Sequence, residues 1–297
     1  MGEPVNIFDR TRHRANRVRA ASAFSDFDFL FRDIGERMAE RLGDVNRRFE
    51  KALFVGGRTP VPEELVGETG RIAEAVTMDL AAPFARDSIV GDEEQLPFRD
   101  QSFDLVFSPL SLHWTNDLPG ALIQMRRALK PDGLLLAALF GGGTLHELRQ
   151  SLMTAELEIE GGVSPRVSPF AEIRDAGGLL QRAGLALPVA DMDTITVTYA
   201  HPLKLLADLR GMAEQNCIIE RRRGFTRRDT LMRAMEIYLE RFSLPDGRVT
   251  ATFEVIYLTG WSPHESQQQA LRPGQATSRL ADALGAIEKG TGEKPGE

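Results

Sequence analysis

Residues 103–140, FDLVFSPLSLHWTNDLPGALIQMRRALKPDGLLLAALF, decide the fold of this chain. The stretch opens on a continuous apolar run at residues 103–110 and closes on another at residues 134–140, and such runs are typical of parallel strands buried on both faces. Residues 118–129 between them are helix-like, and residues 130–133, KPDG, indicate a turn. The order strand, helix, strand predicts a βαβ unit and hence a parallel sheet covered on both faces.

Shorter apolar segments upstream alternate with helix-like ones in the same way. We expect strands at residues 51–55, 73–78 and 87–90. Residues 24–38 carry apolar side chains at three- and four-residue steps, which predicts one amphipathic helix. We therefore expect residues 1–44 to form an N-terminal helical cap that packs over the edge of the sheet or over the cleft at its carboxyl ends.

The second half of the chain predicts further helices and two late strands. Helices are expected at residues 169–183, 201–212 and 229–242, and strands at residues 195–199 and 249–261. Two late strands separated by helical inserts indicate an antiparallel pair that closes the sheet. The expected domain, residues 45–262, is therefore an α/β Rossmann-like fold with a doubly wound, mostly parallel sheet. Residues 263–297 are rich in Gln, Gly, Pro and Glu, so we expect a mostly disordered tail with one short helix at residues 278–287.

The composition excludes several classes of protein. The 297 residues carry a formal net charge of -7 and a pI of about 5.4, which argues against a general nucleic-acid binder because such proteins need a basic surface. The single cysteine, Cys217, can form neither an internal disulfide nor a cysteine zinc site. The longest apolar run, residues 134–140, is too short to span a membrane.

The start of the chain is rich in arginine and lacks the apolar core of a signal peptide. An arginine-rich start is also compatible with an organellar transit peptide. Asp9 and the helix expected after it favour a folded segment instead, and we therefore expect a cytoplasmic protein.

A nucleotide cofactor on an open parallel sheet binds beyond the carboxyl ends of the strands, and candidate ligands occur there in order. Gly56 and Gly57 follow the first strand, where the close approach of backbone to ligand needs glycine. Asp79 ends the second strand, where a carboxylate can accept hydrogen bonds from ribose hydroxyls. Asp92 and Glu93 follow the third strand, where an acid can accept from an adenine amino group.

Each of these residues also has an ordinary structural interpretation. The glycine pair can be a tight turn, Asp79 a helix cap and Asp92 a solvated side chain. Their order at the ends of consecutive strands favours a cofactor site. Ser108, at the end of the fourth strand, faces the same region and completes the candidate set.

Three segments resemble the later motifs of class I methyltransferases, namely residues 91–98, 103–106 and 129–133. This resemblance implies the class I methyltransferase fold, with S-adenosylmethionine as cofactor. Four more segments resemble the family of the mitochondrial complex I assembly factor described as an arginine hydroxylase, with its alphaproteobacterial relatives: residues 8–10, 111–119, 143–148 and 164–170. Methyltransferases acting on malonyl carrier protein share the LHW region at residues 112–114 but resemble the second half less.

The first motif departs from the methyltransferase pattern. Phe54 stands where the family has an acid, and Pro60 stands where it has a glycine. Phenylalanine cannot hold the methionine amino group through water, and proline has a fixed φ and no N–H. The ribose and adenine ends of the site are therefore expected to be intact, whereas the methionine end is expected to be impaired.

Methyl transfer from a sulfonium needs mainly the alignment of the reactants. His113 titrates near neutrality and is a candidate catalytic base, and Trp114 is a candidate wall of the substrate pocket. The alternative is that both residues pack their loop against the following helix. Arg166 lies in a loop suited to cover the cleft, and the arginines at residues 221–223 and 227–228 form either a solvated helix flank or a docking surface for an acidic protein.

Three hypotheses follow. The first is an S-adenosylmethionine-dependent methyltransferase with an unidentified acceptor, proteins included. The second is a protein arginine hydroxylase or assembly factor for respiratory complex I, whose partner is a complex I subunit, although five scattered histidines define no iron site. The third is a non-catalytic binding module that keeps the fold. We expect a small-molecule cofactor, no nucleic acid, no metal and no membrane span, and whether the cofactor binds is the observation on which all three hypotheses turn.

Overall fold

The computed structural model describes residues 6–67, 70–86, 88–170 and 173–267. Its contacts divide the chain into two units, residues 1–263 and 264–297, and the fold below is that of the first. The helix expected at residues 278–287 lies outside the described residues. Among the described helices, none is long and apolar enough to cross a membrane.

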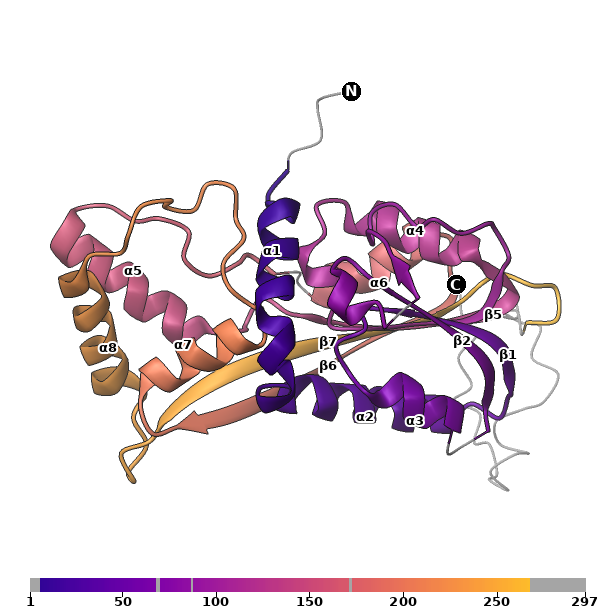
Figure 1. The fold of residues 1–297 in the computed structure, drawn as a ribbon, viewed down its shortest axis with the longest axis horizontal. Helices are drawn as coiled ribbons and strands as arrows, with labels where there is room; N and C mark the ends of the chain where they lie inside the picture. The colour runs from indigo at the N-terminus through magenta and orange to yellow at the C-terminus, as the bar shows by residue number, and fades with distance from the viewer. Residues whose placement is uncertain (1–5, 68–69, 87, 171–172, 268–297) are drawn as a thin grey trace, which may run out of the picture. The chain divides into compact units, whose positions relative to one another are not determined.

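The strands of the first unit form one seven-stranded sheet in the order β3-β2-β1-β4-β5-β7-β6 (Figure 1). Strands β3, β2, β1, β4 and β5 are parallel, whereas β7 runs antiparallel to both of its neighbours, β5 and β6. The doubly wound, mostly parallel sheet and its late antiparallel pair are confirmed. The strand bounds are β1 Phe49–Val55, β2 Ile72–Asp79, β3 Ile89–Val90, β4 Phe103–Pro109, β5 Leu129–Phe140, β6 Ala186–Tyr199 and β7 Val249–Trp261.

Helices cover both faces of this sheet. In Figure 1, α2 and α3 lie on one face and α4 and α6 on the other, while α5, α7 and α8 gather beside the far ends of β6 and β7. The helix bounds are α1 Arg10–Ala20, α2 Phe29–Gly43, α3 Val61–Gly67, α4 Leu118–Ala128, α5 His146–Glu160, α6 Ile173–Arg182, α7 Pro202–Gly211 and α8 Arg228–Phe242. Short 3-10 helices span Ala21–Asp26, Ala82–Phe84 and Leu112–Trp114.

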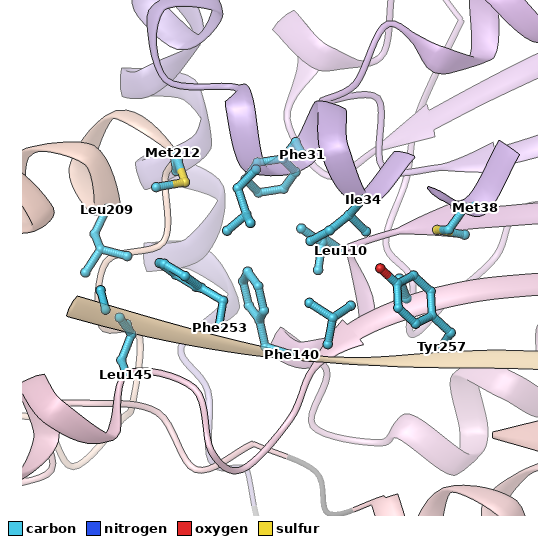
Figure 2. Packing of buried hydrophobic residues seen from close by; sticks show 14 of the residues in the cluster. Phe31, Ile34, Met38, Leu110, Phe140, Leu145, Leu209, Met212, Phe253 and Tyr257 are labelled. Atoms are coloured by element: carbon cyan, nitrogen blue, oxygen red, sulfur yellow. The ribbon is translucent and has the colours of Figure 1, made fainter. Parts of the chain in front are cut away.

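Neighbouring residues of β1 divide the core into two layers. Leu53 packs in the cluster that contains α4 and α6, whereas Phe54 packs in the cluster that contains α2, with its ring 5.5 Å from that of Phe107. Successive side chains of a strand point to opposite faces, so a strand covered on both sides is apolar throughout. Figure 2 shows the α2 side, where Phe31, Ile34 and neighbouring buried side chains pack against one face of the sheet.

Two local expectations were wrong, and two expected strands have other bounds than predicted. Residues 130–133 do not leave the sheet as a turn but lie within β5, where the pairing register slips and Asp132 takes a φ of 62°. Their backbone pairs with the residue that follows β7 instead, since the N–H of Ser262 donates to the carbonyl of Gly133 at 2.8 Å and the N–H of Asp132 donates to the carbonyl of Ser262 at 3.1 Å. Within the described residues, the strand expected at residues 87–90 spans Ile89–Val90, and residue 87 lies outside them. The strand expected at 195–199 begins earlier, at Ala186.

The second error concerns the amphipathic helix expected at residues 24–38. The chain forms a 3-10 turn through Asp26, and α2 begins only at Phe29. The ring of Phe24 packs edge-on against Phe31 and Phe84 at centroid distances of 5.3 and 5.1 Å. Phe24 therefore belongs to the buried apolar set, as its spacing indicated, but reaches the core from a turn. Helices α3 and α5 were not predicted.

Candidate functional site

Two glycines shape the loop that follows β1. Gly56 has a φ of 95°, in the left-handed region that favours glycine, and its N–H donates to the carbonyl of Met78 at 2.8 Å. At Gly57 the φ is ordinary, but a Cβ would lie 1.9 Å from the carbonyl oxygen of Phe84. Both glycines are therefore required by the backbone itself, one for its conformation and one for its close approach.

Asp79 lies at the carboxyl end of β2, as expected, and its carboxylate is fully buried. It accepts hydrogen bonds from the N–H groups of Gly57 at 3.0 Å and Ala81 at 2.8 Å. Its Oδ1 also accepts from Nη1 of Arg17, at 3.1 Å. Asp79 thus orients the glycine loop and carries a buried ion pair with α1.

The two acids after β3 are engaged by the same helix. Arg10 donates to Asp92 at 2.6 Å and also to Glu93. Glu93 is fully buried, accepts from the hydroxyl of Ser111 and lies 3.4 Å from Nη1 of Arg17. Burial alone would raise the pKa of Glu93, but Arg17 and Arg10 outweigh it and lower the pKa to about 2. The structure therefore brings the acids of both strand ends together around two arginines.

Sequence reasoning missed the part played by α1. Arg10 and Arg17 are seven residues apart, which places them on one face of a helix. Between them on that face lies His13, whose Nε2 accepts from Nε of Arg17 at 3.2 Å. Burial lowers the pKa of His13 well below its usual value, and Arg17 and Arg10 lower it further, so the imidazole is neutral. The seven-residue spacing was the signal available in the sequence.

His113 and Trp114 lie in the 3-10 helix after β4, and both point toward Glu214 in the loop after α7. Glu214 accepts from Nε1 of Trp114 at 2.7 Å, from Nε2 of His113 at 3.0 Å and from Arg58 at 2.6 Å. Burial alone would raise the pKa of Glu214, but His113 and Arg58 lower it to about 2. Burial lowers the pKa of His113, with partial compensation from Glu214. Sequence reasoning did not select Glu214, which is 101 residues from His113, 100 from Trp114 and 156 from Arg58.

A cavity of about 1190 Å³ opens between α1, α5, α7 and the loops that follow β4 and α7. Trp114 and Glu214 line it, and so does Arg166, which donates to Glu156 at 2.7 Å and to Thr226 at 2.8 Å. His113 does not line the cavity, but its ring lies 4.7 Å from the ring of Phe140, which does line it. The roles assigned to His113 and Trp114 from the sequence stay predictions.

The remaining sequence candidates have simpler surroundings. Ser108 is buried in β4, and its hydroxyl has no hydrogen-bond partner in the part of the chain that the structure describes. Phe54 is a core residue with no exposed surface, and Pro60 directly precedes α3, where a residue without an N–H is tolerated.

The acceptors suit the adenosine half of a cofactor. Buried carboxylates stand at the ends of β2 and β3 beside a glycine loop, which is the arrangement that ribose hydroxyls and an adenine amino group require. In this conformation Asp79 and Glu93 have no exposed surface and are paired with Arg17. A cofactor can therefore reach them only if α1 shifts and these carboxylates exchange arginine for the ligand.

The strand order and the strand-end carboxylates define a protein of the class I methyltransferase fold. A family model described as "Methyltransferase domain" matches residues 65–137. The YcgJ protein of Bacillus subtilis is similar in structure, with a TM-score of 0.51 at 15% identity, covering 77% of this chain and 99% of that one.

Closer relatives cover nearly the whole chain. It is 41% identical over 290 residues to "Arginine-hydroxylase NDUFAF5, mitochondrial" of Danio rerio, covering 94% of this chain and 89% of the relative. It is 34% identical over 279 residues to malonyl-acyl carrier protein O-methyltransferase of Halorhodospira halophila, covering 90% of this chain and 92% of the relative. The chain belongs to the methyltransferase-fold family that contains both of these proteins.

Proposed function

We propose that this protein is an S-adenosylmethionine-dependent methyltransferase whose acceptor enters the cavity walled by Trp114. The observation that carries the proposal is the set of carboxylates at consecutive strand ends, Asp79, Asp92 and Glu93, beside the Gly56-Gly57 loop. S-adenosylmethionine would supply the methyl group as a sulfonium, so the chain itself has to bind, orient and exclude water.

Each residue of the site has a part in this proposal. Asp79 would accept the ribose hydroxyls and Asp92 or Glu93 the adenine amino group, while the N–H of Gly57 holds the Asp79 carboxylate in place. Trp114 would align the acceptor in the cavity. Glu214 is ionised and can only accept, so Nε2 of His113 donates to it and Nδ1 keeps the basic lone pair. Deprotonation of an acceptor by that nitrogen would require His113 to turn toward the cavity.

The methionine half of the cofactor would be held in an unusual way. Phe54 is sealed in the core and offers no acceptor for the methionine amino group, and Pro60 offers no N–H. On this proposal the first motif is degraded in its chemistry, although the glycine pair still forms the turn. We expect weaker cofactor binding than a complete motif would give.

Isothermal titration with S-adenosylhomocysteine tests the proposal. We expect saturable binding, and Asp79→Asn should weaken it by about 1.5–3 kcal/mol, the range for hydrogen bonds to a charged group. If the single variant unfolds, the double variant Arg17→Met/Asp79→Asn compared with Arg17→Met alone measures the same loss, because both proteins lack the arginine that faces residue 79. Asp100→Asn is the matched control, since Asp100 is half exposed and pairs only with Arg127 among the described residues. Absence of binding at millimolar ligand would overturn the proposal.

A second candidate is protein arginine hydroxylation, favoured by the 41% identity to a relative of that name. Its protein partner would be a subunit of respiratory complex I. The test is mass spectrometry of complex I subunits from a strain that lacks this protein: loss of a hydroxylated arginine would support hydroxylation, and unchanged subunits with normal assembly would reject it. The cytoplasmic location expected from the sequence stays a prediction, and the names of the hydroxylase relatives include the word mitochondrial.

A third candidate is a binding module without catalytic activity, favoured by the closed arrangement of Arg17 over Asp79. Transfer of label from methyl-labelled S-adenosylmethionine to any component of a cell extract would reject it. Cofactor binding without any transfer would support it.

A further inference from the structure

The floor of the cavity is apolar and buried. It is formed by Leu148 and Leu152 of α5 together with Phe140, Leu145, Leu209 and Phe253, each at most 8% exposed. Figure 2 shows Phe140, Leu145, Leu209 and Phe253 grouped around the end of β7. A hydrocarbon body that displaces water from this surface is stabilised in proportion to the apolar area that it buries.

The rim of the same cavity is strongly basic. Its lining includes seven arginines, namely Arg12, Arg19, Arg166, Arg210 and residues 221–223, and only two carboxylates, Asp9 and Glu214. Both carboxylates are already engaged, Asp9 by Arg221 and Glu214 by Arg58. This positive rim stands in a chain whose formal net charge is -7.

Part of that positive charge is not paired with a carboxylate in the part of the chain that the structure describes. Within residues 6–267 as far as they are described, Arg166, Arg221 and Arg222 form ion pairs with carboxylates. The other four arginines of the rim have no such ion pair in the same residues and are exposed. Arg19 donates to the carbonyl of Ala15 and to Oδ1 of Asn16. The exposed guanidinium groups of Arg12, Arg210 and Arg223 are available to an anion, which they can bind with two parallel hydrogen bonds.

An exposed aromatic ring stands at the mouth of the cavity. Phe225 lines the cavity and is 99% exposed, next to the basic residues 221–223. Removal of an exposed phenylalanine ring from water is favourable, so a ligand that contacts this ring would be stabilised by it. The mouth thus combines cationic groups with an apolar contact.

We propose that this cavity binds an anionic amphiphile, with its carboxylate or phosphate head on the arginine rim and its hydrocarbon body on the apolar floor. The rim disfavours cationic ligands, and the deep apolar floor disfavours a wholly polar acidic peptide. As a statement about the methyl acceptor the inference rests on the proposed function. Binding of the amphiphile is independent of the proposed function, because the titrations with amphiphiles contain no S-adenosylmethionine.

The test is isothermal titration of the full chain with dodecanoate and dodecyl phosphate below their micellar concentrations. We expect saturable binding of one or both anions at least tenfold tighter than that of dodecyltrimethylammonium, which has the same chain length and the opposite charge. The two anions distinguish a carboxylate head from a phosphate head. Equal binding of the cation, or tighter binding of an oligoglutamate peptide, would overturn the proposal, and so would absence of binding.

Variants locate the site. Arg210→Glu/Arg223→Glu changes two exposed rim residues and should weaken binding of the preferred anion at least tenfold, with an unchanged circular dichroism spectrum. Leu148→Trp should also weaken it by filling the floor. Arg99→Glu is the matched control, an exposed arginine that does not line the cavity, and should leave binding unchanged.

Titration with S-adenosylhomocysteine separates this inference from the proposed function. If S-adenosylhomocysteine binds and the amphiphiles do not, only the inference about the amphiphile fails. If the amphiphiles bind and S-adenosylhomocysteine does not, only the methyltransferase proposal fails.

Discussion

Nη1 of Arg17 lies 3.1 Å from Oδ1 of Asp79, and neither side chain has any exposed surface. The pair joins α1 to the carboxyl end of β2, residues that are 62 positions apart in the sequence. A buried charge pair is strongly destabilised when one partner is removed, because the other charge is left without compensation. Arg17 therefore holds α1 in place over the carboxylate that the cofactor would use.

Arg17→Met tests whether this arginine competes with the cofactor. We expect the free energy of unfolding to fall by about 3–5 kcal/mol, the range for an uncompensated buried charge. Affinity for S-adenosylhomocysteine should nevertheless rise about tenfold, which corresponds to about 1.4 kcal/mol, because the ligand no longer has to displace Arg17. Urea denaturation and isothermal titration measure the two effects. Arg19→Met, an exposed arginine on the same helix, is the control, and unchanged or weaker affinity in Arg17→Met would contradict the competition.

Gly57→Ala tests the close approach between the glycine loop and the backbone of Phe84. A Cβ here would lie 1.9 Å from the carbonyl oxygen of Phe84, and backbone cannot move aside as a flexible side chain can. We expect a loss of about 1–3 kcal/mol or more, as for overpacking elsewhere, seen as a lower midpoint of urea denaturation. At Gly162 a Cβ meets nothing within 4 Å, so Gly162→Ala should leave the midpoint nearly unchanged. Equal effects of the two substitutions would show that the loop adapts freely.

Acid should destabilise the fold in two steps. The folded-state pKa values of His13 and His113 are lowered, so the stability that their neutral forms contribute is present above the ordinary histidine pKa and is lost as the pH falls below it. Glu93 and Glu214 have pKa values of about 2, so their contribution is present above 4.5 and is lost as the pH falls from 4.5 toward 2. Each group changes the free energy of unfolding by about 1.4 kcal/mol per pH unit within its window.

Urea denaturation at a series of pH values from 7.5 to 4, together with the onset of acid unfolding, measures this dependence. His13→Phe should flatten the upper step. A denaturation midpoint that stays constant from neutral pH to 5 would contradict the burial of two neutral histidines.

Glu214→Gln tests the charge balance of the buried ion pair between Arg58 and Glu214. The substitution leaves the guanidinium of Arg58 without the carboxylate that it contacts at 2.6 Å, so we expect a loss of about 3–5 kcal/mol in the free energy of unfolding. The double variant Arg58→Met/Glu214→Leu removes both charges and should recover much of this loss. Glu220→Gln is the control because that side chain is exposed. A double variant no more stable than Glu214→Gln would show that charge balance is not the cause.

The strands could be predicted because their signals are local. The apolar runs now seen in β4 and β5 and the alternation of β7 each depend on a few adjacent residues that face a buried surface. The same local logic failed at residues 130–133, where Pro and Gly indicate a turn but pairing with the end of β7 keeps the segment within the sheet. It failed again at Phe24, because a 3-10 turn and a helix can present the same ring to the core.

The sequence by itself determined the order of the strands along the chain, the glycine pair and the acids at the ends of β2 and β3, since hydrophobic patterning and strand position are properties of short segments. Only the tertiary structure decided what those acids contact. Arg10 and Arg17 reach them across 62 to 83 residues, and Glu214 reaches Trp114 across 100. Such pairings depend on how separate elements pack against one another, because a buried charge is stable only where the fold brings it a partner.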